Sequence, residues 1–316
     1  MSRLVLGLDT SNYTTSVAVF DGENGCNVGK LLDVPEGGLG LRQSDALFQH
    51  VKRLPGLMEE LVGQQQLHTI RAVGASTRPR AVEGSYMPCF LAGTSQAQAL
   101  ACVLKVPFLP CSHQQGHLAA AAWSAGRMDL LDRPFLAWHL SGGTTELLLV
   151  EPDGNNVKAQ IIGGTSDISA GQLIDRTGVL LGLAFPAGKA LDALYQQGSE
   201  GKPFKVKLQG LEFSLSGMEN KVKAMAQAGE EKASIARFVL DTVTDVVVRA
   251  TRQAQEDYPG LPVLCSGGVA SNSCLRRGMS ERCGAVFARP RYSTDNAMGV
   301  AILTHRALER GAQDES

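Results

Sequence analysis

The sequence of 316 residues predicts an α/β protein built from two related halves. A strand, a polar turn, a second strand and an acidic turn follow one another in residues 6–22, and the same order recurs in residues 139–154. Apolar runs of strand and helix length alternate after each copy. This internal repetition indicates two halves that face each other across a cleft. The 35 glycines permit tight turns and close backbone approach, so they favour a nucleotide or phosphate site built from loops.

The individual elements follow from the spacing of apolar residues and from turn residues. After the first hairpin we expect strands near 28–33, 69–75 and 106–110 and helices near 44–64, 89–104 and 113–125. Pro55 is expected to break or kink the first helix because it lacks an N–H. After the second hairpin we expect helices near 168–182, 187–198, 214–228 and 231–255, strand 261–265, a short helix after Val269, strand 284–288 and a final helix near 296–310.

No linker separates the halves, so the predicted domains are residues 1–125, joined by the C-terminal helix 293–316, and residues 126–292 with a helical insertion. With 44% hydrophobic and 19% charged residues, the chain has ordinary globular composition and enough apolar residues for two cores. Its seven cysteines are odd in number and form no Cys-x-x-Cys pair, which indicates reduced thiols. No apolar run approaches membrane-spanning length and the start resembles a strand, so we expect a cytoplasmic protein without a membrane partner.

The net charge of -1 argues against general electrostatic attraction to nucleic acid, although a local basic patch stays open. The lysines that suggest such a patch are Lys202, Lys205, Lys207, Lys221 and Lys223. A solvated basic face is at least as common an explanation. If the chain acts on RNA, we therefore expect partner proteins to supply part of the RNA-binding surface.

His113 and His117 lie four residues apart in a predicted helix, so both imidazoles project from one face. This is the spacing of metal ligands, but two histidines make half a site at best. A pair that merely flanks a polar helix start is an equally good explanation of the spacing alone. The Gly/Ser/Thr turns of the two hairpins offer N–H and hydroxyl donors for phosphate oxygens, and two matched turns are stronger evidence than one.

Four further segments carry a specific resemblance. They are SAGQLIDRTGVLLGL at 169–183, FSLSG at 213–217, GGVASNSCLR at 267–276 and YSTDNAM at 292–298. Together with the histidine pair they resemble, in order and over nearly the whole chain, the TsaD family, long called O-sialoglycoprotein endopeptidase or glycoprotease. The resemblance implies the duplicated actin-like ATPase fold. It also implies transfer of a threonylcarbamoyl group from its adenylate to adenosine 37 of tRNA, with tRNA and the proteins of that pathway as partners.

The resemblance assigns His113, His117 and Asp295 as ligands of one divalent metal. Asp295 lies in a polar turn before the last helix, where an N-cap role is compatible with ligation. The archaeal and eukaryotic branch has a metal-contacting tyrosine where this chain has His139. A third imidazole would suit zinc, iron or manganese, and a histidine that caps polar groups of the strand is nearly as good an explanation.

The resemblance also implies a site for ATP or an acyl-adenylate. Asp175 and Asp192 match positions that hold the ribose hydroxyls, Gly188 matches a glycine under the base and sugar, and Asn272 matches the purine-side asparagine. The turn expected at the phosphate or acyl-phosphate end comprises Ser141, Gly142, Gly143 and Thr144. Carboxylates accept hydrogen bonds from a ribose diol, although exposed aspartates on helices are common without a ligand.

Three departures from the family pattern favour a divergent paralogue as the alternative. Bacterial members carry two acidic residues after the first Thr-Ser pair, and here Asn12, Tyr13 and Thr14 occupy that stretch. Arg78 and Arg80 lie where the family has a Gly-Pro-Gly loop, and either a substrate anion or only solvent is their expected contact. Glu146 replaces a glutamine beside the second turn.

Metal-dependent threonylcarbamoyl transfer is the leading functional prediction. The alternatives are another carbamoyl-type transferase and a non-catalytic nucleotide-binding partner in a modification complex. A metalloprotease is physically weak, because Gln114 follows His113 where a zinc protease has its glutamate base. No side chain is identified as the general base by the sequence.

Overall fold

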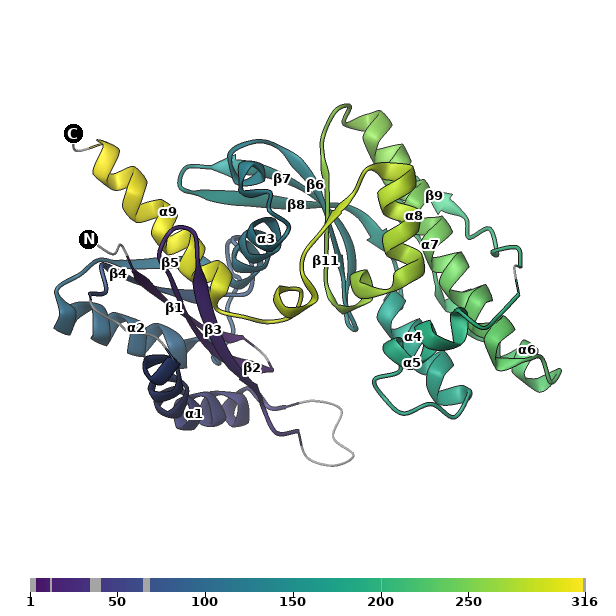
Figure 1. The fold of residues 1–316 in the computed structure, drawn as a ribbon, viewed down its shortest axis with the longest axis horizontal. Coiled ribbons are helices and arrows are strands. Elements are labelled where there is room, and N and C mark those ends of the chain that lie inside the picture. Colours follow the sequence, from purple (N-terminus) through teal and green to yellow (C-terminus); the bar gives the residue numbers. More distant parts are fainter. Residues whose placement is uncertain (1–3, 12, 35–40, 65–68, 200, 315–316) are drawn as a thin grey trace. The chain divides into compact units, whose positions relative to one another are not determined.

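The computed structural model describes residues 4–11, 13–34, 41–64, 69–199 and 201–314. These residues form two compact units, each with helices packed on a β-sheet (Figure 1). The first unit comprises residues 1–133, 151–159 and 294–316, and the second comprises residues 134–150 and 160–293. The predicted α/β class is therefore confirmed.

The first unit contains a five-stranded sheet in the order β3-β2-β1-β4-β5. Its strands are β1 (Val5–Ser11), β2 (Thr14–Phe20), β3 (Gly25–Leu31), β4 (Ala72–Arg78) and β5 (Phe108–Ser112). The first three strands are antiparallel neighbours, and β4 and β5 continue the sheet in parallel with β1. Its helices are α1 (Gln43–Gln64), α2 (Phe90–Leu104), α3 (His113–Ser124) and α9 (Met298–Asp314), with a 3₁₀ turn at Met128–Asp132.

Alternation along β1 decides what each face of this sheet contacts. Leu6 and Leu8 point into a core shared with α1 and α2. Gly7 points to the opposite face, where a Cβ would come within 2.5 Å of the backbone nitrogen of Ala301 in α9. Asp9 shares the face of Gly7 and is fully buried. A carboxylate is thereby placed under the helices α3 and α9 of the first unit.

The second sheet has the order β12-β11-β6-β7-β8-β10-β9. Its strands are β6 (Phe135–Leu140), β7 (Thr145–Asp153), β8 (Asn156–Thr165), β9 (Leu208–Gln209), β10 (Glu212–Phe213), β11 (Val263–Ser266) and β12 (Val286–Phe287). Reading β8-β7-β6-β11-β12 repeats the order β3-β2-β1-β4-β5 of the first sheet, including the parallel pairing of β6 with β11 and β11 with β12. The predicted duplication is therefore present in the strand order.

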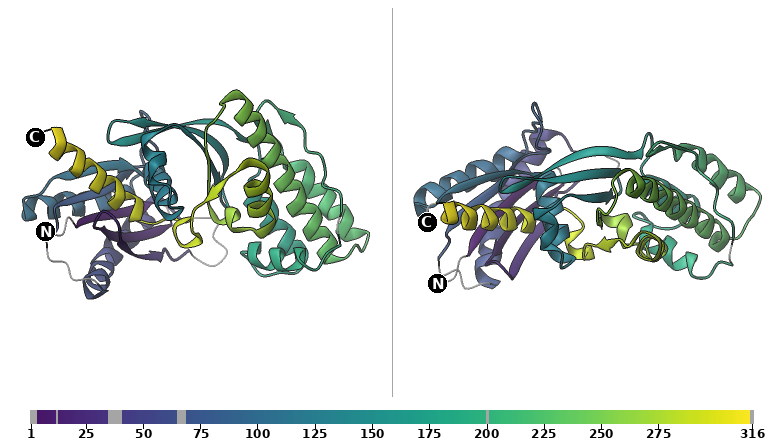
Figure 2. Two further views of the ribbon diagram at one scale, coloured as in Figure 1. Left: turned by 45° about the horizontal axis from the view of Figure 1, so that its top comes forward. Right: turned by 90° about the horizontal axis from the view of Figure 1, so that it is seen from above.

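Five helices cover the second sheet and its edge: α4 (Ala170–Leu180), α5 (Gly188–Tyr195), α6 (Ser216–Gln227), α7 (Lys232–Asp257) and α8 (Ser273–Cys283). The long helix α7 lies beside α8 (Figure 2). Trp138 on β6 is fully buried in this core, and its indole N–H donates to Thr251 of α7 at 2.8 Å. This core holds the strands and helices that carry the second group of site residues.

Several local predictions need correction. Pro55 does not break helix α1, which runs from Gln43 to Gln64; Pro55 and Val51, the residue four positions before it, both lie on the exposed side, and a kink at Pro55 stays a prediction. Strand β8 is absent from the prediction, and the expected short helix after Val269 is a 3₁₀ turn followed by the 11-residue helix α8. None of the seven cysteines forms a disulfide, and no helix in the described ranges is long and apolar enough to cross a membrane.

Candidate metal centre and nucleotide cavity

Helix α3 begins at His113 because Ser112 caps it. The Ser112 hydroxyl accepts from the backbone N–H of Gln115 at 3.2 Å, and the Gln115 side chain accepts from the Ser112 N–H at 2.8 Å. This reciprocal pair is a capping box, which satisfies two backbone donors of the first turn. The first residue of the helix is thereby held at the carboxyl end of β5, with His117 one turn later on the same face.

His113, His117 and Asp295 converge on one point in the first unit. The Nε2 atoms of the two histidines lie 2.9 Å apart. Oδ1 of Asp295 lies 3.2 Å from Nε2 of His117 and 3.5 Å from Nε2 of His113. Ligands about 2.1 Å from a shared ion are separated by about 3 Å, so these distances fit one bound metal without rearrangement.

Asp9 lies on the opposite side of the His113 ring from Asp295. Nδ1 of His113 is 3.1 Å from the carboxylate of Asp9, which also accepts from the hydroxyls of Ser11 and Ser76. A carboxylate behind a ligating imidazole fixes the tautomer and leaves Nε2 free to bind a metal. Asp9 is therefore placed to orient His113.

The charges of this cluster favour a cation. Burial lowers the pKa of His113, but the charge of Asp9 and the hydrogen bonds to Asp295 and Asp9 outweigh it and raise this pKa to about 10. Burial also opposes ionisation of Asp295, yet hydrogen bonds to His113 and His117 hold its pKa well below the ordinary value. Two carboxylates around two imidazoles give a site that attracts positive charge.

The carboxylate of Asp295 is not needed to cap α9, because a neighbouring residue does so. The side-chain oxygen of Asn296 accepts from the N–H of Met298 at 3.1 Å, so Asn296 performs the capping expected of Asp295. Close contact between α3 and α9 positions the turn, since a Cβ on Gly299 would overlap the carbonyl oxygen of Gly116. Two histidines and one carboxylate with open positions suit Fe(II) or a catalytic zinc ion.

The second unit holds the Gly-rich turn between β6 and β7. Ser141 N–H donates to the Thr144 carbonyl at 2.8 Å, and the Ser141 hydroxyl accepts from Thr144 N–H at 3.1 Å. Ser169, the N-cap of α4, donates its hydroxyl to the Gly142 carbonyl at 2.6 Å. The turn is thus tied to a helix N-terminus, which is a favourable place for a phosphate.

A cavity of about 440 Å³ extends from this turn across α4, α5 and the start of α8. Five residues predicted to bind the nucleotide line it: Gly142, Asp175, Gly188, Asp192 and Asn272. Its volume lies in the range of small-molecule sites. Lys189, which the sequence analysis did not single out, adds a cation to the wall.

The two aspartates of this cavity differ in their hydrogen bonds. Asp175 accepts from the N–H of Ala187 at 2.8 Å, which joins α4 to the start of α5. Asp192 accepts from Asn272 Nδ2 at 3.0 Å and from the Ser273 N–H and hydroxyl at 3.1 and 2.7 Å. Asn272 also caps α8, accepting from Leu275 N–H at 3.0 Å. Asp175 therefore retains more free acceptor capacity for a ribose than Asp192 does.

Other predicted residues lie outside these two clusters. His139 lies on β6 of the second unit, and its role as a further metal ligand stays a prediction. Arg78 ends β4 and Arg80 follows in the loop whose Pro79 carbonyl accepts from Gln114 N–H at 3.0 Å. Thr14 opens β2, Tyr13 precedes it with 38% exposure, and Asn12 lies outside the described residues.

Asp9 is not among the site residues predicted from the sequence. The acidic residues of the family pattern follow Thr10 and Ser11, whereas the carboxylate that contacts His113 precedes them. The sequence feature that could have identified Asp9 is an aspartate at an inward-facing position near the end of a buried strand, because buried carboxylates are rare unless paired.

The model of the family described as tRNA N6-adenosine threonylcarbamoyltransferase matches residues 35–302. A curated relative of that name from Thermus thermophilus is 33% identical over 97% of this chain and 94% of its own length. The chain belongs to this family. A relative of the same name from Chlorobium phaeovibrioides is 29% identical over 99% of this chain and 96% of its own length.

Solved structures resemble the fold of this family member. Full-length HypF in its phosphate- and nucleotide-bound form matches 98% of this chain and 56% of its own, with a TM-score of 0.62 and 13% identity. Component A of (R)-2-hydroxyglutaryl-CoA dehydratase from Acidaminococcus fermentans matches 98% of this chain and all of its own, with a TM-score of 0.57 and 14% identity. The predicted actin-like ATPase fold is thereby confirmed.

Proposed function

We propose that this chain transfers a threonylcarbamoyl group from threonylcarbamoyl-adenylate to N6 of adenosine 37 in tRNA. The observation that carries the proposal is the convergence of His113, His117 and Asp295, with nitrogen and oxygen atoms 2.9 to 3.5 Å apart. These residues lie in a member of the tRNA N6-adenosine threonylcarbamoyltransferase family. A protease is not favoured, because the residue after His113 is Gln114.

The first unit contributes the metal ligands. His113, His117 and Asp295 would hold one divalent ion, with iron and zinc favoured by the donor set and manganese also compatible. Such an ion, when bound, supplies Lewis acidity that polarises a carbonyl or phosphoryl oxygen. Asp9, 3.1 Å from Nδ1 of His113, would keep the proton on Nδ1 and so leave Nε2 available as a ligand.

The second unit contributes the adenylate site. Gly142 and Gly143, next to the N-terminus of α4, would bind the phosphate of the leaving adenylate, and Asp175 would accept from the ribose hydroxyls. Gly188 leaves room for the sugar and base, and Asp192 positions Asn272 on the purine side. Holding the donor in a fixed pose leaves its carbonyl carbon open to the incoming amine.

The remaining assignments concern the surroundings of the reaction. Arg78 and Arg80 would meet a phosphate or carboxylate of a substrate, because guanidinium groups pair with such anions. The net charge of -1 supports a need for partner proteins that complete the tRNA-binding surface. A chain that modifies tRNA works where tRNA is, and we infer the cytoplasm.

A second candidate is a carbamoyl-type transferase with another acceptor. The observation that favours it is the uncharged pair Tyr13 and Thr14, where the sequence analysis expects acidic residues of the family. Asp9 supplies a carboxylate to the same end of β1, which supports retention of the first activity.

The test is to incubate the purified, iron- or zinc-loaded chain with threonylcarbamoyl-adenylate and unmodified tRNA, with and without partner proteins of the pathway. Nucleosides are then analysed by mass spectrometry. Threonylcarbamoyladenosine is the expected product. Its absence in all mixtures, with metal and adenylate still bound, would favour the carbamoyl-type transferase.

A further inference from the structure

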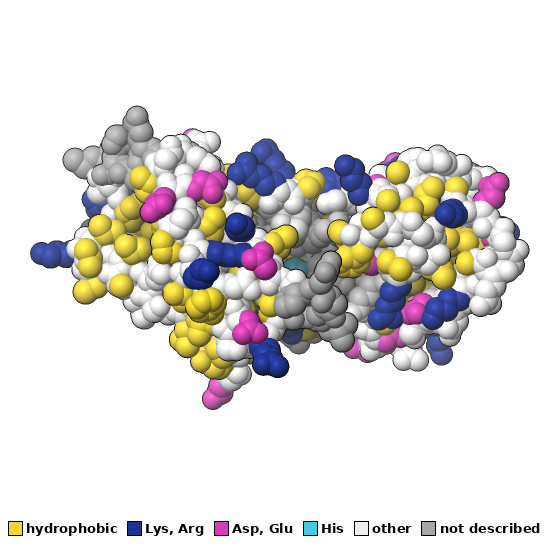
Figure 3. All heavy atoms as spheres, turned by 90° about the horizontal axis from the view of Figure 1, so that it is seen from below, with side chains coloured by type: hydrophobic (Ala, Val, Ile, Leu, Met, Phe, Trp, Pro, Cys, Tyr) yellow, Lys and Arg dark blue, Asp and Glu magenta, His cyan; other side chains and the backbone are white. Residues whose placement is uncertain are grey.

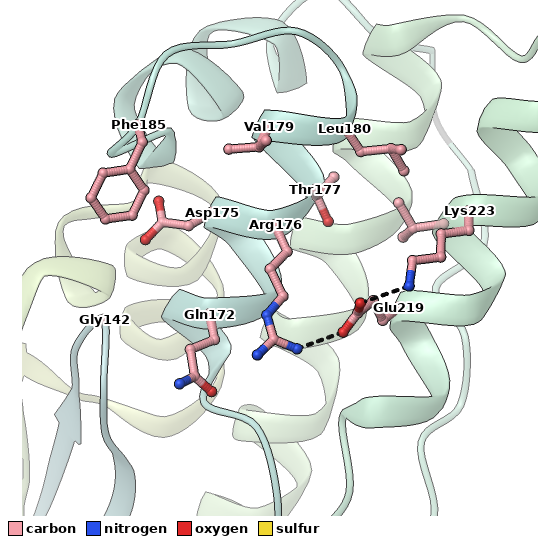
Figure 4. Close-up of a pocket in the computed structure, with 11 residues that line it drawn as sticks. Gly142, Gln172, Asp175, Arg176, Thr177, Val179, Leu180, Phe185, Glu219 and Lys223 are labelled. Carbon is pink, nitrogen blue, oxygen red and sulfur yellow. Dashed lines mark hydrogen bonds and ion pairs between the residues drawn. The ribbon is translucent and has the colours of Figure 1, made fainter. Parts of the chain in front are cut away.

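The second unit contains another cavity, whose lining residues are drawn in Figure 4. Its volume is about 550 Å³, and it shares two wall residues, Gly142 and Asp175, with the adenylate cavity. A ligand in this cavity would therefore contact two residues that also line the proposed adenylate site. None of the functional assignments above uses the side chains that line the rest of this cavity.

One side of the cavity is apolar. Val179 and Leu180 at the end of α4 and Val222 on α6 form its aliphatic wall, and Phe185 stands at its mouth. Phe185 is 74% exposed, so most of its side-chain surface is open to solvent. A flat ring stacked on Phe185 would remove that surface from water.

The other side carries a bridged pair of cations. Arg176 on α4 and Lys223 on α6 contact the two oxygens of Glu219, at 2.7 and 2.9 Å (Figure 4). These hydrogen bonds, from Lys223 first and then Arg176, hold the pKa of Glu219 below its ordinary value, so it stays ionised. The Glu219 carboxylate therefore holds Arg176 and Lys223 together at the cavity wall, where Asp175 adds a second carboxylate.

The helices present these residues for a simple reason. Gln172, Arg176 and Leu180 recur at four-residue spacing on α4, and Glu219, Val222 and Lys223 recur at three- and four-residue spacing on α6. Each set therefore shares one helix face, and both faces line the cavity. Lysine and arginine side chains also lie next to hydrophobic ones over the second unit on the face shown in Figure 3.

We propose that this cavity receives one unstacked nucleotide of the acceptor RNA, with its base on Phe185 and the aliphatic wall and its phosphate on Arg176 and Lys223. The inference rests on the proposed function, since it names the acceptor's contact with that same site. Single-stranded RNA is bound by aromatic stacking combined with cations, and the cavity offers both.

The first experiment measures the binding of tRNA and the binding of the adenylate separately. Phe185→Ala and the double variant Arg176→Gln/Lys223→Gln are compared with wild type, in the presence of the partner proteins, for tRNA Kd, tRNA KM and adenylate KM. We expect tRNA Kd and KM to rise about tenfold for each, with kcat and adenylate KM within about twofold. Phe185→Trp should restore tRNA affinity, because indole also stacks. Arg252→Gln, an exposed arginine on α7, is the matched control and should change nothing.

The second experiment tests for direct contact between position 185 and the tRNA. With p-benzoylphenylalanine at position 185, irradiation in the presence of unmodified tRNA should cross-link the protein to a nucleotide of the anticodon loop. Two results overturn the proposal: variants that raise adenylate KM and leave tRNA Kd unchanged, or bound tRNA without a cross-link at 185. Because tRNA Kd is measured without turnover, a wild-type chain that binds tRNA but transfers nothing would contradict the proposed function and not this inference.

Discussion

Asp9 and His113 face each other at 3.1 Å in the first unit, on the side of the imidazole away from Asp295. Asp9 is fully buried and accepts two serine hydroxyls as well, so its orientation is fixed by the sheet rather than by the metal ligands. This relationship would make the proposed metal site dependent on a residue that is not among its proposed ligands. It also explains why a polar side chain occupies an interior position of β1.

Asp9→Asn should weaken metal binding about 10- to 100-fold, because an amide neither holds the His113 tautomer nor compensates the charge of the bound ion. Competition with a fluorescent chelator measures the metal Kd. Asp21→Asn is the control: Asp21 caps an exposed turn through backbone N–H groups of Glu23 and Asn24, which an amide oxygen can still accept. An Asp9→Asn variant with wild-type metal affinity would contradict the orienting role.

Gly171→Ala should disturb the adenylate site. A Cβ at Gly171 would lie 2.5 Å from Cα of Gly142 and would overlap the Ser141 carbonyl, so the phosphate-binding turn must move. We expect a loss of about 1–3 kcal/mol in stability and at least tenfold weaker adenylate binding, measured by urea unfolding and calorimetry. Gly217→Ala on α6 is matched, because its Cβ would meet nothing within 4 Å. Equal effects from both variants would rule out the steric explanation.

His50 should make the protein less stable in acid. It is fully buried and bonded to the Thr15 hydroxyl at 2.8 Å, and burial lowers its pKa to about 4 although the charge of Asp9 opposes this. Between pH 6.5 and 4 the unfolded chain therefore binds more protons than the folded chain. The contribution of neutral His50 to the free energy of unfolding is present above pH 6.5 and is lost as the pH falls through this window.

His50→Gln retains a hydrogen-bonding side chain and removes the titration. Between pH 7 and pH 5, unfolding free energy should fall by about 2 kcal/mol more in wild type than in the variant. Urea unfolding at the two pH values measures this difference. Parallel pH curves for both proteins would show that His50 does not titrate as argued.

The sequence predicts the strand-and-helix alternation well because apolar periodicity and turn residues encode it locally. Strand β8 was missed, since only Val157, Gly163 and Gly164 are buried in it and no apolar alternation results. The break predicted at Pro55 was wrong because the cost of an interior proline depends on which side of the helix faces solvent. Both errors concern tertiary surroundings, which a local pattern does not contain.

In the candidate site too, some features can be predicted from the local sequence and others appear only in the fold. Spacing alone pairs His113 with His117, but only the fold brings Asp295, 178 residues beyond His117, within 3.2 Å of it. The resemblance to the family supplied Asp295 and the nucleotide residues in advance. Asp9 and the cavity between α4 and α6 required the structure, because they depend on strand facing and on the packing of two helices.

The most direct measurement compares threonylcarbamoyladenosine formation by the wild-type chain and by His113→Ala/His117→Ala, together with the metal content of each protein. We expect product and about one equivalent of metal for wild type, and neither for the double variant. Transfer at the wild-type rate by a double variant that contains no metal would contradict the proposed role of the metal.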